Sequence, residues 1–407
     1  MAPPNPELTV LCLASYFKGS RFIETVKKEG CRVILLTLEK LLHERWPREH
    51  LDEVLAIPGK SPMNERRQEV IHTVSYLART RKIDRVVPLD DYDVEVAAML
   101  REHMRLPGMG ETTARYFRDK LAMREKAHDS GVKVPAFVHV LNHDRIRDFL
   151  REVPGPWVFK PRSEAASLGI KRIEHADDVW PLIDDLGDRQ SHYLIEKMIP
   201  GDVFHVDAIS WEREILFARA HKYRRPILGI TQEGGVFGTT SVERGGDEER
   251  GLLAFHAELL QKLGFVRGVT HTEFIRGKDD GELYFLETAA RAGGAHITDL
   301  VEAEAGINLW EEWARIEVRQ GKWTYSLPAA REDHAGLLVS LAREERPDTS
   351  HYTDPEIVWR AIEKSHHVGL IFRSPSHARV VELMDQYEAR IRQDFQAILP
   401  PPSTATA

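Results

Sequence analysis

The sequence contains little cysteine, no long apolar run and no long basic run. Cys12 and Cys31 are the only cysteines among 407 residues. Both lie in apolar, strand-like runs, which predicts buried, reduced thiols and favours a cytoplasmic protein. No stretch of 18 apolar residues occurs, and the N-terminal MAPPNPE lacks a basic region followed by an apolar one. We therefore expect neither a membrane span nor a signal peptide.

An excess of positive charge is also missing. The net charge is −8, with 56 Lys and Arg against 64 Asp and Glu, so we expect no nucleic-acid partner. A hydrophobic content of 42% and a charged content of 29% are typical of a globular protein. The length predicts two to three domains. The final PPPSTATA, residues 400–407, is expected to be a disordered tail.

The first 115 residues alternate between strand and helix signals. Apolar runs predict buried parallel strands at 8–13, 33–36, 54–57 and 85–89. Helical spacing of apolar residues predicts helices at 20–30, capped by Ser20, and at 64–80. This rhythm favours an α/β fold with an open, doubly wound parallel sheet. The loop after the first strand has no G-x-G-x-x-G pattern, so no dinucleotide site is assigned.

An acidic group follows the fourth predicted strand, at Asp90, Asp91, Asp93 and Glu95. These residues could face a substrate or a metal. The favoured interpretation is an acidic first helical turn that complements the helix dipole.

The middle of the chain places charged residues next to turns. A strand at 157–160 ends in Lys160, and the small residues of 163–169 would let backbone N–H groups approach phosphate oxygens. An ordinary hairpin with a surface lysine is equally compatible with this pattern. Further on, the run 193–199 carries Glu196 towards a Pro-Gly turn, where the chain could pass between two lobes. His205 and Asp207 then share one face of the next predicted strand.

Several further segments have clear local signals. Residues 115–130, 144–152, 252–263, 297–305, 309–320 and 378–395 have helical periodicity. The loop 229–238 is long and rich in glycine, which makes it a candidate lid. The last helix is strongly amphipathic and could pack internally or against a second subunit, so a homodimer is one possibility.

The stretch 283–294, LYFLETAARAGG, carries the strongest chemical signal. Together with the run 269–275 and the turn GKDDG between them, it predicts an antiparallel hairpin. If the turn centres near Asp279, Glu273 faces roughly Phe285, and Glu287 lies one diagonal step away on the same face. Two such carboxylates can hold Mg²⁺ between them, although two solvent-facing strand residues would give the same pattern.

The order of these pieces resembles the ATP-grasp superfamily over roughly residues 115–325. DKLAM at 119–123 followed by GVKVP is similar to the start of its nucleotide-binding region, and WVFKPRSEAASLGI to its strand lysine and phosphate flap. LIEKMIPGD is similar to its inter-lobe hinge. HTEF and FLETAARAGG resemble its paired metal carboxylates and substrate-side arginine. Within the superfamily, the pattern is most similar to L-amino-acid ligase-like carboxylate–amine ligases.

This resemblance implies a division into domains. Residues 1–115 would be a pre-ATP-grasp α/β domain, and residues 116–325 the ATP-grasp domain. Its small lobe would span about 130–195 and its large lobe about 196–325. Residues 326–399 would form a C-terminal α+β module.

The resemblance also implies a reaction, namely ATP-dependent formation of an amide or peptide bond through an acylphosphate, with release of ADP and phosphate. The substrates would be a small carboxylate and an amine, and the ion Mg²⁺ or Mn²⁺. The implied ATP contacts are Lys120 and Lys160 to the phosphates, Glu196 with the backbone of Lys197, Met198 and Ile199 to adenine, and His205 and Asp207 to ribose. Lys222 would be a further phosphate contact or simply a solvated cation. The implied metal ligands are Glu273 and Glu287. The implied substrate residues are Arg291, Gly293, Gly294 and His271, with Arg291 and Lys160 catalytic.

Two positions depart from the superfamily pattern. Ala289 stands where many members carry an asparagine that helps to hold a second metal, and amino-acid ligases often lack that asparagine. The flap has Ala165 and Ala166 where glycine is more usual. Two other functions therefore stay open: another ATP-grasp enzyme of the purine-pathway or carboxylase type, and an ATP-binding protein without catalysis.

Overall fold

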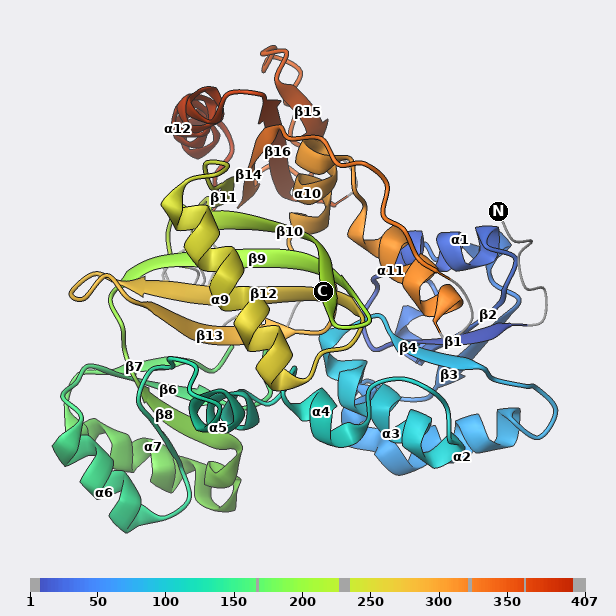
Figure 1. The fold of residues 1–407 in the computed structure, drawn as a ribbon, viewed down its shortest axis with the longest axis horizontal. Helices are drawn as coiled ribbons and strands as arrows, with labels where there is room; N and C mark the ends of the chain where they lie inside the picture. The colour runs from blue at the N-terminus through green and yellow to red at the C-terminus, as the bar shows by residue number, and fades with distance from the viewer. Residues whose placement is uncertain (1–7, 166–167, 227–234, 321–323, 362–363, 398–407) are drawn as a thin grey trace.

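The computed structural model describes residues 8–165, 168–226, 235–320, 324–361 and 364–397. These residues form three β-sheets with flanking helices (Figure 1). Within the described ranges, no helix combines the length and apolarity needed to cross a membrane. Most of the candidate lid at 229–238, part of the phosphate flap and the predicted tail lie outside the described residues.

The N-terminal sheet is parallel, with strand order β3-β2-β1-β4. Its strands are β1 (Thr9–Ala14), β2 (Arg32–Leu38), β3 (Glu53–Ile57) and β4 (Arg85–Pro88). Helix α1 (Ser20–Lys28) lies on one side of this sheet, and α2 (Arg67–Leu77) and α3 (Val94–Met104) lie on the other (Figure 1). The doubly wound parallel sheet predicted from the alternating pattern is therefore present.

Two local predictions in this half of the chain were wrong. Ser20 is the first helical residue of α1 rather than its cap, and Gly19 occupies the cap position with φ +81°. The helix predicted for 115–130 begins later, as α5 (Lys120–Asp129), and Arg115 is instead the last residue of a separate helix, α4 (Glu111–Arg115). Asp119 causes the restart, because its carboxylate accepts from the N–H groups of Leu121 and Ala122 as an N-cap.

The second sheet is a small antiparallel one with order β5-β8-β6-β7. Its strands are β5 (Phe137–His139), β6 (Trp157–Pro161), β7 (Lys171–Ile173) and β8 (Tyr193–Lys197). Helices α6 (His143–Glu152) and α7 (Val179–Leu186) pack on it through a separate apolar core that includes Ile146 and Phe159.

The third sheet has eight strands in the order β13-β12-β9-β10-β11-β14-β16-β15. Its first five strands in that order are β13 (Leu283–Ala289), β12 (Gly268–Gly277), β9 (Gly201–Trp211), β10 (Glu214–Tyr223) and β11 (Phe237–Ser241). The C-terminal strands β14 (His334–Leu341), β16 (His367–Ser374) and β15 (Ile357–Arg360) extend the same sheet. The C-terminal module thus has no sheet of its own among the described residues.

Helices cover both faces of this large sheet. Helix α9 (Asp247–Leu263) packs on one face against Phe204, Phe274 and Phe285. On the other side, α10 (Ile297–Ala305) contacts β14 and β16, and α11 (Leu309–Arg319) contacts β9, β12 and α1. The final helix α12 (His377–Asp394) buries its apolar residues against β14 and β16. Of the two possibilities for this helix, the structure thus shows packing within the chain.

Candidate active site

Two carboxylates face each other at the edge of the large sheet. Glu273 on β12 pairs directly with Glu287 on β13. The predicted diagonal arrangement was wrong, because Glu273 pairs with Glu287 rather than with Phe285, two residues away. The register shift between Glu273 and Phe274 accounts for one of these two residues. Directly opposed side chains are closer than diagonal ones, so the two carboxylates lie nearer together than in the predicted arrangement. Glu273 accepts a hydrogen bond from the Tyr223 hydroxyl at 2.8 Å.

Lys120 lies beside this pair. It is the first residue of α5, and its Nζ lies 3.0 Å from Glu287 Oε2. The same Nζ donates to the carbonyl oxygen of Glu164, at the start of the predicted flap, at 2.6 Å. Burial alone would raise the pKa of Glu287, but the nearby charges of Lys120 and Lys160 outweigh it and lower that pKa. The structure therefore brings the first predicted phosphate lysine to a predicted metal ligand.

Lys160 is held on β6 against Glu196 of β8. Both side chains are buried, and Lys160 Nζ donates to Glu196 Oε1. Arg124, fully buried on α5, binds the other carboxylate oxygen of Glu196 at 3.0 Å. Burial lowers the pKa of Lys160 to about 8, with Arg124 and Lys120 adding to the effect and Glu196 opposing it. The Glu196 carboxylate, predicted to accept from adenine, is thus already engaged by two cations.

The hinge residues after Glu196 are partly exposed. The backbone N–H of Lys197 donates to Ala136 and that of Met198 donates to Pro156. Ile199 follows and packs near Val203 and Tyr223. The N–H groups of Lys197 and Met198 are therefore already bonded within the protein. The hinge offers a ligand its carbonyl groups and apolar side chains instead.

Arg291 lies in the loop that joins β13 to α10. Its Nη2 is 3.5 Å from Asp91 Oδ2, and its Nη1 donates to the Ala292 carbonyl. Gly293 has no room for a side chain, because a Cβ there would lie 3.0 Å from Asp207 Oδ1 and 3.1 Å from His271 Nδ1. At Gly294 a Cβ would meet nothing within 4 Å. The two glycines of this loop thus have different surroundings.

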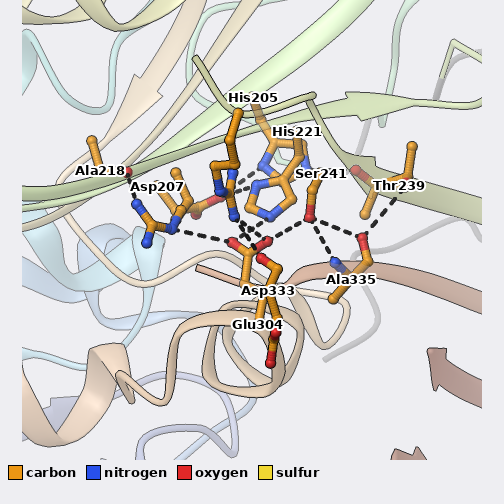
Figure 2. A network of polar contacts seen from close by, with 12 residues as sticks. His205, Asp207, Ala218, His221, Thr239, Ser241, Glu304, Asp333 and Ala335 are labelled. Carbon is orange, nitrogen blue, oxygen red and sulfur yellow. Dashed lines mark hydrogen bonds and ion pairs between the residues drawn. The ribbon is translucent and has the colours of Figure 1, made fainter. Parts of the chain in front are cut away.

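His205 and Asp207 lie on the same face of the large sheet as Glu273, which pairs with His205 across β9 and β12. Both are fully buried, and Asp207 accepts from His205 Nδ1 at 2.7 Å and from His271 Nδ1 at 2.9 Å. Figure 2 shows their network, which continues to His221 and Glu304. The two residues predicted to contact ribose are therefore engaged in a buried polar network: strand alternation identified their common face, but not that this face is buried.

Of this network, His271 alone reaches the candidate site. Its Nε2 lies 3.6 Å from Glu273 Oε1. Burial would lower its pKa, but Asp207 and Glu273 outweigh burial and raise it to about 10. His205, by contrast, has its pKa lowered to about 4, mainly by burial. His271 is thus a protonated side chain beside the carboxylate pair.

Lys222 lies on the wrong face of the sheet for phosphate binding at this site. It pairs with Phe204, which pairs with Phe274, and Phe274 points to the face opposite its neighbour Glu273. Its Nζ lies 2.6 Å from the exposed Asp202. The solvated-cation interpretation is the one that fits.

Sequence reasoning gave too little weight to Asp91. Of the acidic group at 90–95, Asp90 accepts from the N–H of Tyr92, and Asp93 binds Ser15. Asp91 instead lies between Arg291 and Arg118, at 3.5 and 3.8 Å. Burial opposes ionisation, but these arginines hold the pKa of Asp91 at about 2. The position after a parallel strand was the available signal, since ligands bind at such strand ends.

A cavity of about 620 Å³ lies elsewhere, beside α9. Its lining residues are Ser210, Arg213, Ile215, Ala257, Glu258, Leu260, Gln261 and Phe265. None of these is a predicted site residue. We therefore place the candidate site at the convergent charges of Glu273, Glu287, Lys120, Lys160 and Arg291.

Comparisons with known proteins show which proteins the chain resembles as a whole. No protein-family model matches the chain. It is 28% identical over 242 residues to the L-arginine-specific L-amino acid ligase of Bacillus subtilis, a match that covers 58% of each chain. The chain thus spans less than two thirds of the length of that curated relative.

Solved structures extend the likeness to the whole chain. The L-amino acid ligase of Bacillus licheniformis superposes with a TM-score of 0.76 over 97% of this chain and 99% of that one, at 16% identity. The biotin carboxylase domain of Hydrogenobacter thermophilus 2-oxoglutarate carboxylase, solved with MgADP, ADP and bicarbonate, gives 0.69 over 93% and 88%, at 14% identity. The chain therefore has the ATP-grasp fold of these structures.

Proposed function

We propose that the protein is an ATP-dependent carboxylate–amine ligase that forms an amide or peptide bond through an acylphosphate. The observation that carries the proposal is the convergence of the Glu273–Glu287 pair, two lysines and Arg291 from separate segments. The name of the curated relative, an L-amino acid ligase, supports the same reaction class.

The opposed carboxylates fit a hard divalent cation. Both offer oxygen ligands. The side chain of Glu287 is 37% exposed, and Lys120 neutralises its negative charge. We assign Glu273 and Glu287 as ligands of Mg²⁺ or Mn²⁺. A structurally similar protein, the biotin carboxylase domain solved with MgADP, supports that choice. When bound, the ion would neutralise phosphate charge during phosphoryl transfer. Ala289 contributes no side-chain oxygen, so we assign these two carboxylates alone.

The remaining residues would position ATP and the acid. Lys120 and Lys160 would exchange their present carboxylate partners for phosphate oxygens, which supplies positioning and charge neutralisation. The backbone of Lys197, Met198 and Ile199 would contact adenine. Glu196, which Arg124 would still bind after Lys160 turns to phosphate, would not touch the base. Arg291 would stabilise charge on the transferred phosphoryl group or orient the acid, with Gly293 and Gly294 lining that pocket.

His271 would face the same pocket as a cation. Its position beside Glu273 and its raised pKa support a role next to an anionic substrate group.

We also propose that the chain is divided into domains at 1–115, 116–325 and 326–399, with a tail at 400–407. The extension of the large sheet by β14–β16 means that the third part would act as an addition to the large lobe.

Phosphate release from Mg-ATP, measured against a panel of amino acids singly and in pairs, tests the function. A ligase requires an acid for hydrolysis and gives a condensed mass only when an amine is also present. Release that depends on bicarbonate or on a purine-pathway acid would favour another ATP-grasp reaction. ATP binding without any stimulated release would favour a non-catalytic protein.

The Glu287→Gln variant tests the metal assignment in the same assay. Loss of a charged ligand to the ion should lower turnover by about 100-fold or more, in line with losses of about 2.7 kcal/mol or more in transition-state stabilisation. The Lys222→Met variant is the control, since that side chain points to the other face. Unchanged turnover in Glu287→Gln would refute the metal assignment.

A further inference from the structure

A second buried arginine lies next to Arg291. Arg118 belongs to the segment between α4 and α5, two residues before Lys120. It is 3% exposed, and its guanidinium carbon lies 4.5 Å from the ring centroid of Tyr92. No motif pointed to this residue, and the proposed mechanism does not use it.

The charge of Arg118 is poorly balanced. Among the described residues, its ion pair is with Asp91, where Nη1 lies 3.8 Å from Oδ2. The same Oδ2 also pairs with Arg291 Nη2, at 3.5 Å. Both distances exceed those of charge-assisted hydrogen bonds. Four buried atoms here have no hydrogen-bond partner in the described part of the chain: Asp91 Oδ1, Arg118 Nε, Arg118 Nη2 and Arg291 Nε.

The neighbouring carboxylates are already engaged. Asp90 binds Lys18 at 2.7 Å, and Glu164 accepts from the Tyr92 hydroxyl at 2.8 Å. Asp93 binds Ser15, and Glu287 lies against Lys120. Two guanidinium groups therefore share one carboxylate, which leaves the Arg118 Nε and Nη2 donors without an acceptor in the described part of the chain.

A buried charge without a partner is costly, because its lost hydration is not replaced. Stacking on Tyr92 offsets part of this cost but offers nothing to the Nε and Nη2 donors. The group that these donors lack is an anion with several acceptor oxygens. A planar guanidinium fork fits a carboxylate in particular.

We propose that Arg118 is a substrate-binding residue that, together with Arg291, receives the carboxylate of the acid to be activated. This proposal rests on the proposed ligase function. A terminal phosphate of the nucleotide is the other source of such an anion. The carboxylate is favoured because Arg118 contacts Asp91 and Tyr92 of the turn that follows β4, whereas Lys120 and Lys160 lie against Glu287 and Glu196.

The Arg118→Met variant of the full chain separates these sources. Two measurements are needed: the KM of each acid that stimulates phosphate release, and the Kd of Mg–AMP-PNP. Loss of charge-assisted hydrogen bonds should raise the acid KM by about 10- to 100-fold, while the nucleotide Kd changes by less than about 3-fold. A weakened nucleotide with an unchanged acid KM would overturn the proposal in favour of a phosphate site.

Stability provides a second readout. Because Arg118 is incompletely paired, Arg118→Met should keep or raise the Tm of the ligand-free protein. The matched control is Arg101→Met, which removes a buried arginine that donates to the carbonyls of Val86 and Met109. This control should lower the Tm and leave the acid KM unchanged. A lowered Tm with an unchanged acid KM in Arg118→Met would show a structural cation and refute the assignment.

If Arg118→Met does not fold, Arg118→Lys keeps the charge without the fork and should still raise the acid KM. If the wild type shows no acid-stimulated phosphate release, the ligase function itself fails. The Arg118 assignment is then judged by the Tm shift that L-arginine causes with Mg–AMP-PNP present, and an equal shift in wild type and Arg118→Met overturns it.

Discussion

Each cation assigned to phosphate or substrate lies against a carboxylate when no ligand is bound. Lys120 faces Glu287, Lys160 faces Glu196, and Arg291 faces Asp91. Such pairs offset the cost of burying the cations before ATP arrives. Binding of the nucleotide with its metal ion would then exchange partners, with the ion replacing Lys120 on Glu287.

The buried Lys160 predicts a pH dependence. Its pKa is about 8, so it is protonated at lower pH and loses its positive charge as the pH rises through that value. In the free enzyme, kcat/KM for Mg-ATP should therefore fall above about pH 8. Lys160→Arg, which stays protonated, should remove this fall while lowering the plateau. A wild-type profile that stays flat to pH 9.5 would contradict the assignment.

Residue types were easier to predict from the sequence than their partners. Lys160, Glu273, Glu287 and Arg291 stood out because each sits beside a turn or a strand end. Asp91 did not, since its partner Arg291 lies 200 positions along the chain and only tertiary packing joins them. His205 and Asp207 matched a strand pattern equally well whether exposed or buried.

At the scale of elements, the loop from β13 to α10 is fitted closely to the network below it. Gly293 lies over the Asp207–His271 hydrogen bond, and two non-glycine residues after it, Ala295 and His296, have φ of +49° and +65°. Backbone of this kind persists only where surrounding contacts hold it. The loop that carries Arg291 is therefore fixed from beneath rather than free.

Alanine substitutions in the two neighbouring glycines test this fit. In Gly293→Ala the new Cβ would lie 2.9 Å from Ile297, with Asp207 and His271 close by. Overpacking of this size should lower the free energy of unfolding by about 1–3 kcal/mol and reduce kcat, because the loop must shift. Gly294→Ala has open space and should keep the wild-type Tm in thermal unfolding. Equal effects of the two changes would show that packing beneath the loop is unimportant.

Elements were predicted well where the local pattern was complete, and poorly where one side chain decides. The α10 range, 297–305, was predicted correctly because its periodicity and its glycine stop are both present in the sequence. The break between α4 and α5 depends on the Asp119 cap, and the Glu273–Glu287 register depends on a bulge. Neither feature is visible in hydrophobic periodicity.

Across the molecule, two of the three sheets share an apolar core and the third has its own. One continuous apolar core joins the N-terminal sheet to α11, where Phe22 and Trp313 lie 5.2 Å apart between ring centroids. Arg85 of β4 also donates to backbone carbonyls at the end of α11. The small antiparallel sheet has a separate core. The N-terminal sheet and the large sheet should therefore move as one body, and the small lobe should move against them about the 197–201 hinge.

Hydrogen exchange can test this division with two core substitutions. Trp313→Ala removes the ring shared by α1 and α11 and should cost about 3–5 kcal/mol, so amide exchange should rise in β1, β2 and α11 together. Ile146→Ala, in the core of the small lobe, should cost about 2–5 kcal/mol and raise exchange in β5, β6 and α6 alone. Because the two cores share no residues, each change should leave the other region protected. Exchange that rises throughout the chain in Ile146→Ala would mean that the small lobe is not an independent unit, and the proposed hinge motion would lose its basis.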